Sequence, residues 1–110
     1  MHKQPCVYLL ASRHNGTLYV GVTSDLIKRV YEHREKLLDG FTKRYGVPDP
    51  VWYEVYERME SAILREKQLK KWPRAAKIRL IEQSNSGWCD LWPDLMSPSL
   101  GSGFRQSLPE

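Results

Sequence analysis

The chain has 110 residues, of which 17 are basic and 13 acidic, so its formal net charge is +4. This length provides one hydrophobic core and excludes a large multidomain architecture. Two cysteines exclude a disulfide framework, and no apolar stretch is long enough for a signal peptide or a membrane span. We therefore expect a cytoplasmic protein with no membrane partner. The positive charge suits a polyanionic partner, although a run of charges is more often a solvated helix face.

The first predicted unit is a β-hairpin, with strands over residues 5–13 and 17–23. Asn15-Gly16 between two apolar runs is a strong hairpin signal, and a turn at these two residues pairs His14 with Thr17. Tyr8 and Tyr19 then share one face, and a slip of two residues would keep them there. Ordinary packing of the two rings in the sheet is the alternative explanation for them.

Two further features of the hairpin bear on its place in the protein. The first strand is apolar on both faces from Val7 to Ala11, which favours a central position in the sheet. Gly21 lies on the tyrosine face without a Cβ, so it would leave room for a backbone or a phosphate to approach. A glycine at a strand bulge is the other interpretation.

A helix is predicted to begin at Thr23-Ser24-Asp25, with Ser24 as N-cap, and to end at Gly40. Arg29 and His33 lie one turn apart on the flank of its apolar stripe. Arg34 falls within that stripe, so either its side chain snorkels outward or the helix loosens there.

The middle of the chain combines a loop, a strand and a second helix. The loop over residues 41–50 mixes aromatic and basic side chains (Phe41, Lys43, Arg44 and Tyr45), which suits either nucleic-acid contact or packing onto the core. A third strand is predicted over 51–57 and a helix over 60–72. Glu66 lies on the inner side of that helix, one turn before Lys70. A carboxylate there should be neutralised, bind a cation or pair with Lys70 at the rim.

A third helix is predicted from Pro73 to about Gln83, ended by Asn85-Ser86-Gly87. Trp88, Leu91 and Trp92 should dock back on the core. Residues 97–110 are rich in Ser, Gly and Pro, which is typical of a flexible tail. The expected organisation is one domain over residues 1–96 followed by that tail.

Four segments in this order resemble the GIY-YIG nuclease superfamily, and in particular its small stand-alone bacterial members. They are Val7-Tyr8-Leu9, Tyr19-Val20-Gly21, the helix start from Thr23 to Val30, and Arg65-Glu66-Lys67. The first motif departs from its name, with Val7 in place of glycine. The resemblance runs from about Pro5 to Trp92. It implies an α/β fold: a small three-stranded antiparallel sheet flanked by helices in the order ββαβαα, with the third strand beside the first.

The resemblance also implies a metal-dependent endonuclease that hydrolyses nucleic-acid phosphodiester bonds, with DNA as the expected substrate. A domain this small has little surface for reading a long base sequence, so we expect a single-stranded or structured substrate. Glu66 would hold one Mg²⁺ or Mn²⁺ ion, and no organic cofactor is expected. Arg29 would bind the phosphate, Tyr19 would lie beside the attacking water and Tyr8 would be its neighbour. His33 would be a second base, a phosphate ligand or a surface histidine.

The expected nucleic-acid contacts are mostly basic: Gly21, Lys28, Lys43, Arg44, Lys67, Lys70, Lys71 and Arg74. One alternative is a nucleic-acid-binding module of the same fold without catalysis. Another is a protein-interaction domain that uses its four tryptophans. The oligomeric state stays open.

Overall fold

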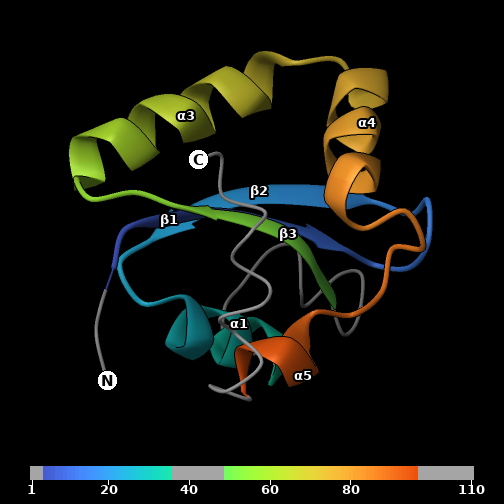
Figure 1. Cartoon of the computed structure of the whole chain (residues 1–110), viewed down its shortest axis with the longest axis horizontal. Helices are drawn as coiled ribbons and strands as arrows, with labels where there is room; N and C mark the ends of the chain where they lie inside the picture. Colours follow the sequence, from blue (N-terminus) through green and yellow to red (C-terminus); the bar gives the residue numbers. More distant parts are fainter. Residues whose placement is uncertain (1–3, 36–48, 97–110) are drawn as a thin grey trace.

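The structure, a computed structural model, describes residues 4–35 and 49–96. Its centre is a three-stranded antiparallel sheet made of β1 (Cys6–Ala11), β2 (Leu18–Thr23) and β3 (Asp49–Val55), in the order β2-β1-β3 (Figure 1). All six residues of β1 are buried, because helices cover both faces of the central strand. The predicted central position of the first strand and the α/β fold class are therefore confirmed.

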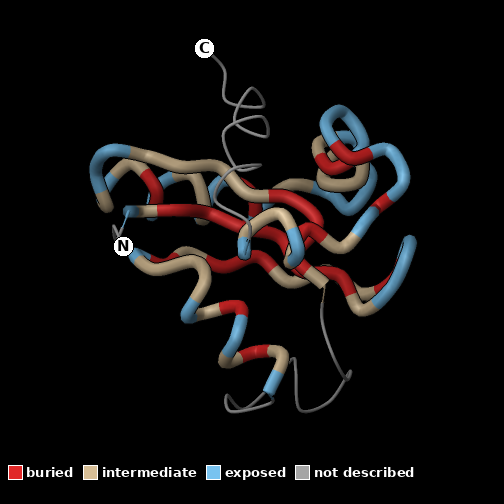
Figure 2. Tube along the Cα trace, turned by 60° about the horizontal axis from the view of Figure 1, so that its bottom comes forward, coloured by how far each residue is buried: buried red, intermediate tan, exposed pale blue. Residues whose placement is uncertain are grey.

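Helices lie on both faces of the sheet. On one face are α1 (Leu26–Arg34) and the short α5 (Trp92–Leu95), and on the other are α3 (Met59–Lys71) and α4 (Arg74–Ser84) (Figure 1). Figure 2 shows buried residues concentrated in the strands and alternating with exposed ones along the helices. Among the described residues, the elements follow the predicted order, and α5 follows as an additional helix.

Each face of the sheet has its own apolar cluster. The cluster under α3 and α4 is the larger one, and that under α1 and α5 contains Tyr8, Leu10 and Val30. Strand alternation explains the division, since successive residues of β1 point to opposite faces. The two clusters are therefore separated by the backbone of the same strand.

The register of the hairpin differs from the prediction by two residues. Tyr8 lies opposite Gly21 and Leu10 opposite Tyr19. The ladder closes at Ser12 and Thr17, where the Ser12 amide donates to the Thr17 carbonyl at 3.0 Å. Asn15 has φ 60°, which allows residues 13–16 to form a four-residue connection instead of a two-residue turn. Because the slip is an even number, every side chain keeps its predicted face.

The ends of α1 also differ from the prediction. Asp25, not Ser24, is the N-cap, and its carboxylate accepts a hydrogen bond from the Lys28 amide at 3.2 Å. The helix ends at Arg34, and the predicted end at Gly40 lies outside the described residues. The side chain of Arg34 does not snorkel into water. It pairs with Asp90 at 3.3 Å and lies over the ring of Trp92, so it joins α1 to α5.

The segment after α4 packs on the core as predicted. Trp88 and Leu91 are each 5% exposed. Asn85 ends α4 and holds the following turn, because its side chain donates to the carbonyl oxygens of Val51 and Cys89 at 3.0 and 2.9 Å. The side chains predicted for the loop (Phe41, Lys43, Arg44 and Tyr45) and for the tail over 97–110 lie outside the described residues. Among the described helices, none is long and apolar enough to cross a membrane.

Candidate active site

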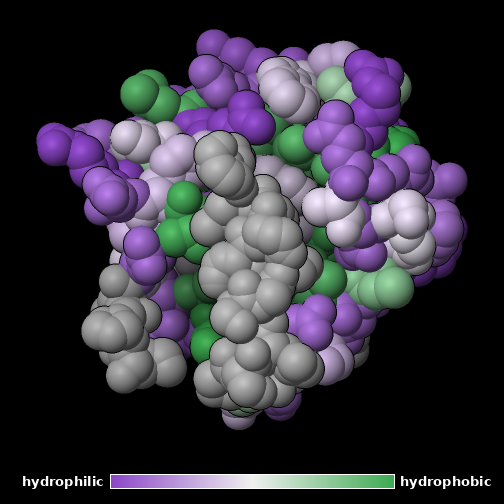
Figure 3. Space-filling view, viewed as in Figure 1, coloured by the Kyte–Doolittle hydropathy of each residue, from purple (hydrophilic) through white to green (hydrophobic). Residues whose placement is uncertain are grey.

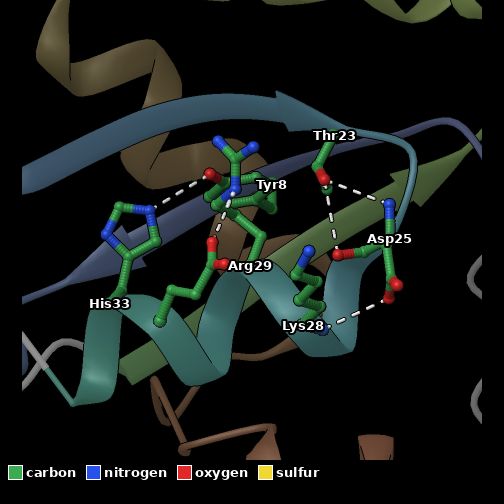
Figure 4. A network of polar contacts seen from close by, with 7 residues as sticks. Tyr8, Thr23, Asp25, Lys28, Arg29 and His33 are labelled. Atoms are coloured by element: carbon green, nitrogen blue, oxygen red, sulfur yellow. Dashed lines mark hydrogen bonds and ion pairs between the residues drawn. The ribbon is translucent and has the colours of Figure 1, made fainter. Parts of the chain in front are cut away.

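Four of the predicted catalytic side chains meet on the α1 face of the sheet. Tyr8 from β1 and His33 from α1 form a hydrogen bond of 3.3 Å between Oη and Nε2 (Figure 4). The ring centroid of Tyr19 lies 6.3 Å from that of Tyr8 and 5.1 Å from that of His33. Figure 4 places the guanidinium of Arg29 beside the Tyr8 phenol. We call Tyr8, Tyr19, Arg29 and His33 the α1-side cluster.

Gly21 makes this arrangement possible. A Cβ at this position would overlap Cζ and Oη of Tyr8 and lie 2.8 Å from its Cε1. The phenol of Tyr8 therefore occupies the space that the glycine leaves open. The sequence predicted that a backbone or a phosphate would use this space. In the structure the Tyr8 ring uses it, so the need for a glycine is explained without a ligand.

Arg29 supplies the positive charge of the α1-side cluster, and 40% of its side chain is exposed. Its Nε lies 3.4 Å from the Glu32 carboxylate (Figure 4). Sequence reasoning did not include Glu32 in the site, although its position three residues after Arg29 is the spacing of a helix ion pair. Glu32 orients the guanidinium, whose five N–H groups also allow it to donate to the Tyr8 phenol and to a further acceptor.

Tyr8 is a neutral phenol at ordinary pH. Burial raises its pKa well above the usual value of 10, and the neighbouring Tyr19 raises it further, while the positive charge of Arg29 acts in the opposite direction. The residue is fully buried, with no exposed surface. Tyr8 therefore holds His33 in place and is poorly suited to contact water itself, whereas Tyr19 is only partly buried.

His33 is not a surface histidine, because only 2% of it is exposed. Burial lowers its pKa below the usual 6.5, and Arg29 lowers it further, whereas the Glu32 carboxylate opposes both. Its Nδ1 is buried and has no hydrogen-bond partner among the described residues. The imidazole is therefore neutral near pH 7, with one nitrogen engaged by Tyr8.

Glu66 lies on α3, the helix that covers the opposite face of the sheet. It sits on the inner side of that helix, between the buried Ala62 and Leu69, and its side chain is 14% exposed. Its Oε2 pairs with Nζ of Lys70 at 2.8 Å. The rim pair that the sequence offered as one alternative is therefore present.

β2 is an edge strand of the described sheet, and it carries Tyr19. α3 packs against β2 and β1. The hydrogen bond to Glu66 is the main reason that the pKa of Lys70 is raised, and the charge of Tyr19 adds to the effect. Tyr19 on β2 therefore contributes to the electrostatic surroundings of Lys70 on α3.

Glu66 can hold a divalent ion only if water and substrate supply the other ligands of the ion. Among the described residues, no group of three or more His, Cys, Asp or Glu side chains could enclose a metal. Mg²⁺ commonly uses one or two carboxylates and fills its other positions with water and phosphate oxygens. A single, slightly exposed carboxylate matches that pattern.

The predicted nucleic-acid contacts are spread over three helices. Lys28 is exposed on α1, Lys67, Lys70 and Lys71 are exposed on α3, and Arg74 begins α4. Hydrophilic side chains dominate the visible surface over α3 and α4 (Figure 3). Lys43 and Arg44 lie outside the described residues.

The model of the GIY-YIG catalytic domain matches residues 4–79, which are most of the chain. The chain belongs to the GIY-YIG family. The UPF0213 protein of Staphylococcus aureus strain Mu3 is 33% identical over 69 residues, which cover 63% of this chain and 84% of that protein. The UPF0213 proteins SA0446 of strain N315 and SACOL0530 of strain COL match to the same extent. No solved structure gives a significant match.

Membership confirms the resemblance seen in the sequence. A GIY-YIG domain implies a nuclease-type function and a nucleic-acid substrate, and nucleases of this family generally depend on a divalent metal. The match ends at residue 79 and so includes Tyr8, Tyr19, Arg29, His33 and Glu66.

Proposed function

We propose that this GIY-YIG protein is a divalent-metal-dependent endonuclease that hydrolyses phosphodiester bonds in nucleic acid, with DNA as the expected substrate. The observation that carries the proposal is the assembly of Tyr8, Tyr19, Arg29 and His33 from three elements around one hydrogen bond. Packing alone needs no arginine and no histidine at this place. Phosphodiester hydrolysis needs a phosphate-binding cation and groups that position water.

The exposure of each side chain in the α1-side cluster indicates its role in the proposed reaction. Arg29 is accessible and carries a planar guanidinium, so it binds the non-bridging oxygens of the phosphate. Tyr19 is partly exposed and lies beside the attacking water. Tyr8 is buried and neutral, so it acts as a positioning residue for His33. The neutral imidazole of His33 keeps the capacity to accept a proton.

Glu66 would hold the Mg²⁺ or Mn²⁺ ion, which when bound neutralises charge on the phosphate oxygens. Lys70 occupies the cationic position beside the carboxylate in the present arrangement. The side chain of Lys70 is 57% exposed, so its ammonium can move into water and leave the carboxylate to a divalent ion. β2 carries Tyr19 and packs against α3, so Tyr19 and the helix that carries Glu66 lie at the same edge of the described sheet.

The decisive experiment compares the wild type with Glu66→Gln, a substitution that keeps the shape and removes the charge. Single-stranded, duplex and hairpin oligonucleotides are incubated with Mg²⁺, with Mn²⁺ and with chelator. We expect metal-dependent cleavage by the wild type and a loss of about 100-fold or more in the variant, as for removal of a group that stabilises transition-state charge. Glu60→Gln on the same helix, an exposed residue paired with Arg58, is the matched control and should cleave normally.

The same experiment separates the alternatives. Oligonucleotide binding without cleavage under every metal condition would favour a nucleic-acid-binding module of this fold that lacks catalysis. No binding at low salt would contradict both. Full activity of Glu66→Gln would remove Glu66 from the metal site and leave the α1-side cluster to be tested by Arg29→Gln.

A further inference from the structure

A polar hollow of about 280 Å³ lies at the connection between β1 and β2, outside the α1-side cluster. The residues that line it are Arg13, Asn15, Gly16, Thr17 and Arg74. Both charged residues among them are arginines, and no acidic side chain belongs to the lining. Charge complementarity therefore favours an anion as the ligand.

The hollow is shaped by contacts that exist without a ligand. Nη2 of Arg74 donates to the Asn15 carbonyl at 2.7 Å and ties the start of α4 to the connection. Within the connection, the Gly16 amide donates to the Arg13 carbonyl at 2.8 Å. Gly16 is buried, and a Cβ there would overlap Oγ of Ser12 and lie 2.9 Å from Cγ of Arg13. The connection is thus preorganised, which reduces the entropic cost of binding.

The two guanidinium groups retain most of their hydrogen-bonding capacity. A guanidinium has five N–H donors, and the contact with Asn15 uses one nitrogen of Arg74. Within residues 4–35 and 49–96, neither Arg13 nor Arg74 has a carboxylate within ion-pair distance. Two arginines that converge without a carboxylate are matched to a phosphate, which accepts several hydrogen bonds at once.

The position of the hollow relates it to the proposed active site. Thr17 lies directly before β2 and two residues before Tyr19, a separation of about 7 Å along the strand direction. Phosphates of one nucleic-acid strand recur about every 3.4 Å along the axis of a duplex. A strand held at the α1-side cluster would therefore bring a nearby phosphate to the hollow.

We propose that this hollow binds a backbone phosphate of the substrate strand, a few nucleotides from the bond that is cleaved. The proposal rests on the proposed nuclease function and adds a second phosphate site, with Arg13 as its new member. A backbone contact of this kind fixes the register of the strand without reading its sequence.

The test measures binding by fluorescence anisotropy over a series of salt concentrations, with chelator present to prevent cleavage. The probes are a fluorescein-labelled single-stranded DNA and an RNA of the same sequence. Arg13→Gln should raise the Kd for both probes about 5- to 10-fold and reduce the slope of log K against log salt by about 0.7. Arg13→Lys should restore the slope, because it restores the charge.

Arg58→Gln is the matched control, because this arginine is exposed, with 72% of its side chain accessible, and its salt bridge is to Glu60 on α3. It should bind like the wild type. Thermal unfolding of both variants checks that the fold is kept.

The proposal is overturned if Arg13→Gln and Arg58→Gln have the same Kd and the same salt slope. In that case, metal-dependent cleavage by the wild type would leave the nuclease function standing. A wild type that neither binds nor cleaves either probe would overturn both proposals. An effect on RNA alone would also contradict a phosphate contact, since it would point to the 2′-hydroxyl.

Discussion

The two faces of the sheet hold their part of the site in different ways. On the α1 face, Tyr8 and His33 are buried and joined by a hydrogen bond, so core packing holds the cluster in one geometry. On the α3 face, Glu66 pairs with Lys70, whose side chain is 57% exposed, so water competes for the ammonium. Core packing therefore fixes the geometry of the α1-side cluster, whereas the ammonium of Lys70 on the other face is exposed and can move.

The strongest test of the buried half is Gly21→Ala. The new methyl group would collide with the Tyr8 ring, which is enclosed by the core and cannot move away. We expect a loss of about 1–3 kcal/mol in the free energy of unfolding, as for overpacking elsewhere, measured by urea denaturation. Gly87→Ala is the control, because a Cβ there meets only Sγ of Cys89, at 3.6 Å. Equal stability of the two variants would show that the Tyr8 ring is loosely held.

The pH dependence of stability tests the same half through His33. Burial, followed by the charge of Arg29, lowers its pKa in the folded protein below the usual 6.5. The unfolded chain therefore binds a proton more readily, and the stability that His33 contributes is present above pH 6.5 and lost as the pH falls below it. In His33→Gln this loss should be smaller, as followed by denaturation at several pH values.

Nuclear magnetic resonance titration of the imidazole sharpens that prediction. Glu32→Gln should lower the pKa of His33 further, because it removes the charge that opposes the shift. Arg29→Gln should raise it. A titration midpoint at or above 6.5 in the wild type would contradict the buried, neutral imidazole.

The smallest effect on stability is expected for the ion pair between Glu66 and Lys70 on the α3 face. Lys70→Gln removes an i,i+4 helix ion pair whose lysine is exposed, and such pairs are worth about 0.3–0.5 kcal/mol. Lys67→Gln on the same helix is the control for loss of a positive charge, and chemical denaturation compares the two. A loss as large as that of Gly21→Ala would mean that the pair is part of the core, and the contrast between the two faces would disappear.

Local patterns in the sequence were sufficient for the elements and for most of the candidate site. The helical spacing of Arg29 and His33 and the alternation of Tyr8 and Tyr19 each depend on neighbours a few residues apart. The hairpin register was missed by two residues because the Asn-Gly signal does not distinguish a two-residue turn from the four-residue connection that Asn15 adopts. Glu32 was missed because an ordinary helix pair looks the same near a site and away from it.

The chemical groups, the alternation of the strands and the family motifs can be found in the sequence, since they follow from local periodicity and residue type. Three facts required the folded structure: Tyr8 fills the space beside Gly21, His33 is buried, and Arg13 and Arg74 line one hollow. Those facts depend on contacts between segments that are distant along the chain. Burial and charge, which set the pKa of each group, act through space and not along the sequence.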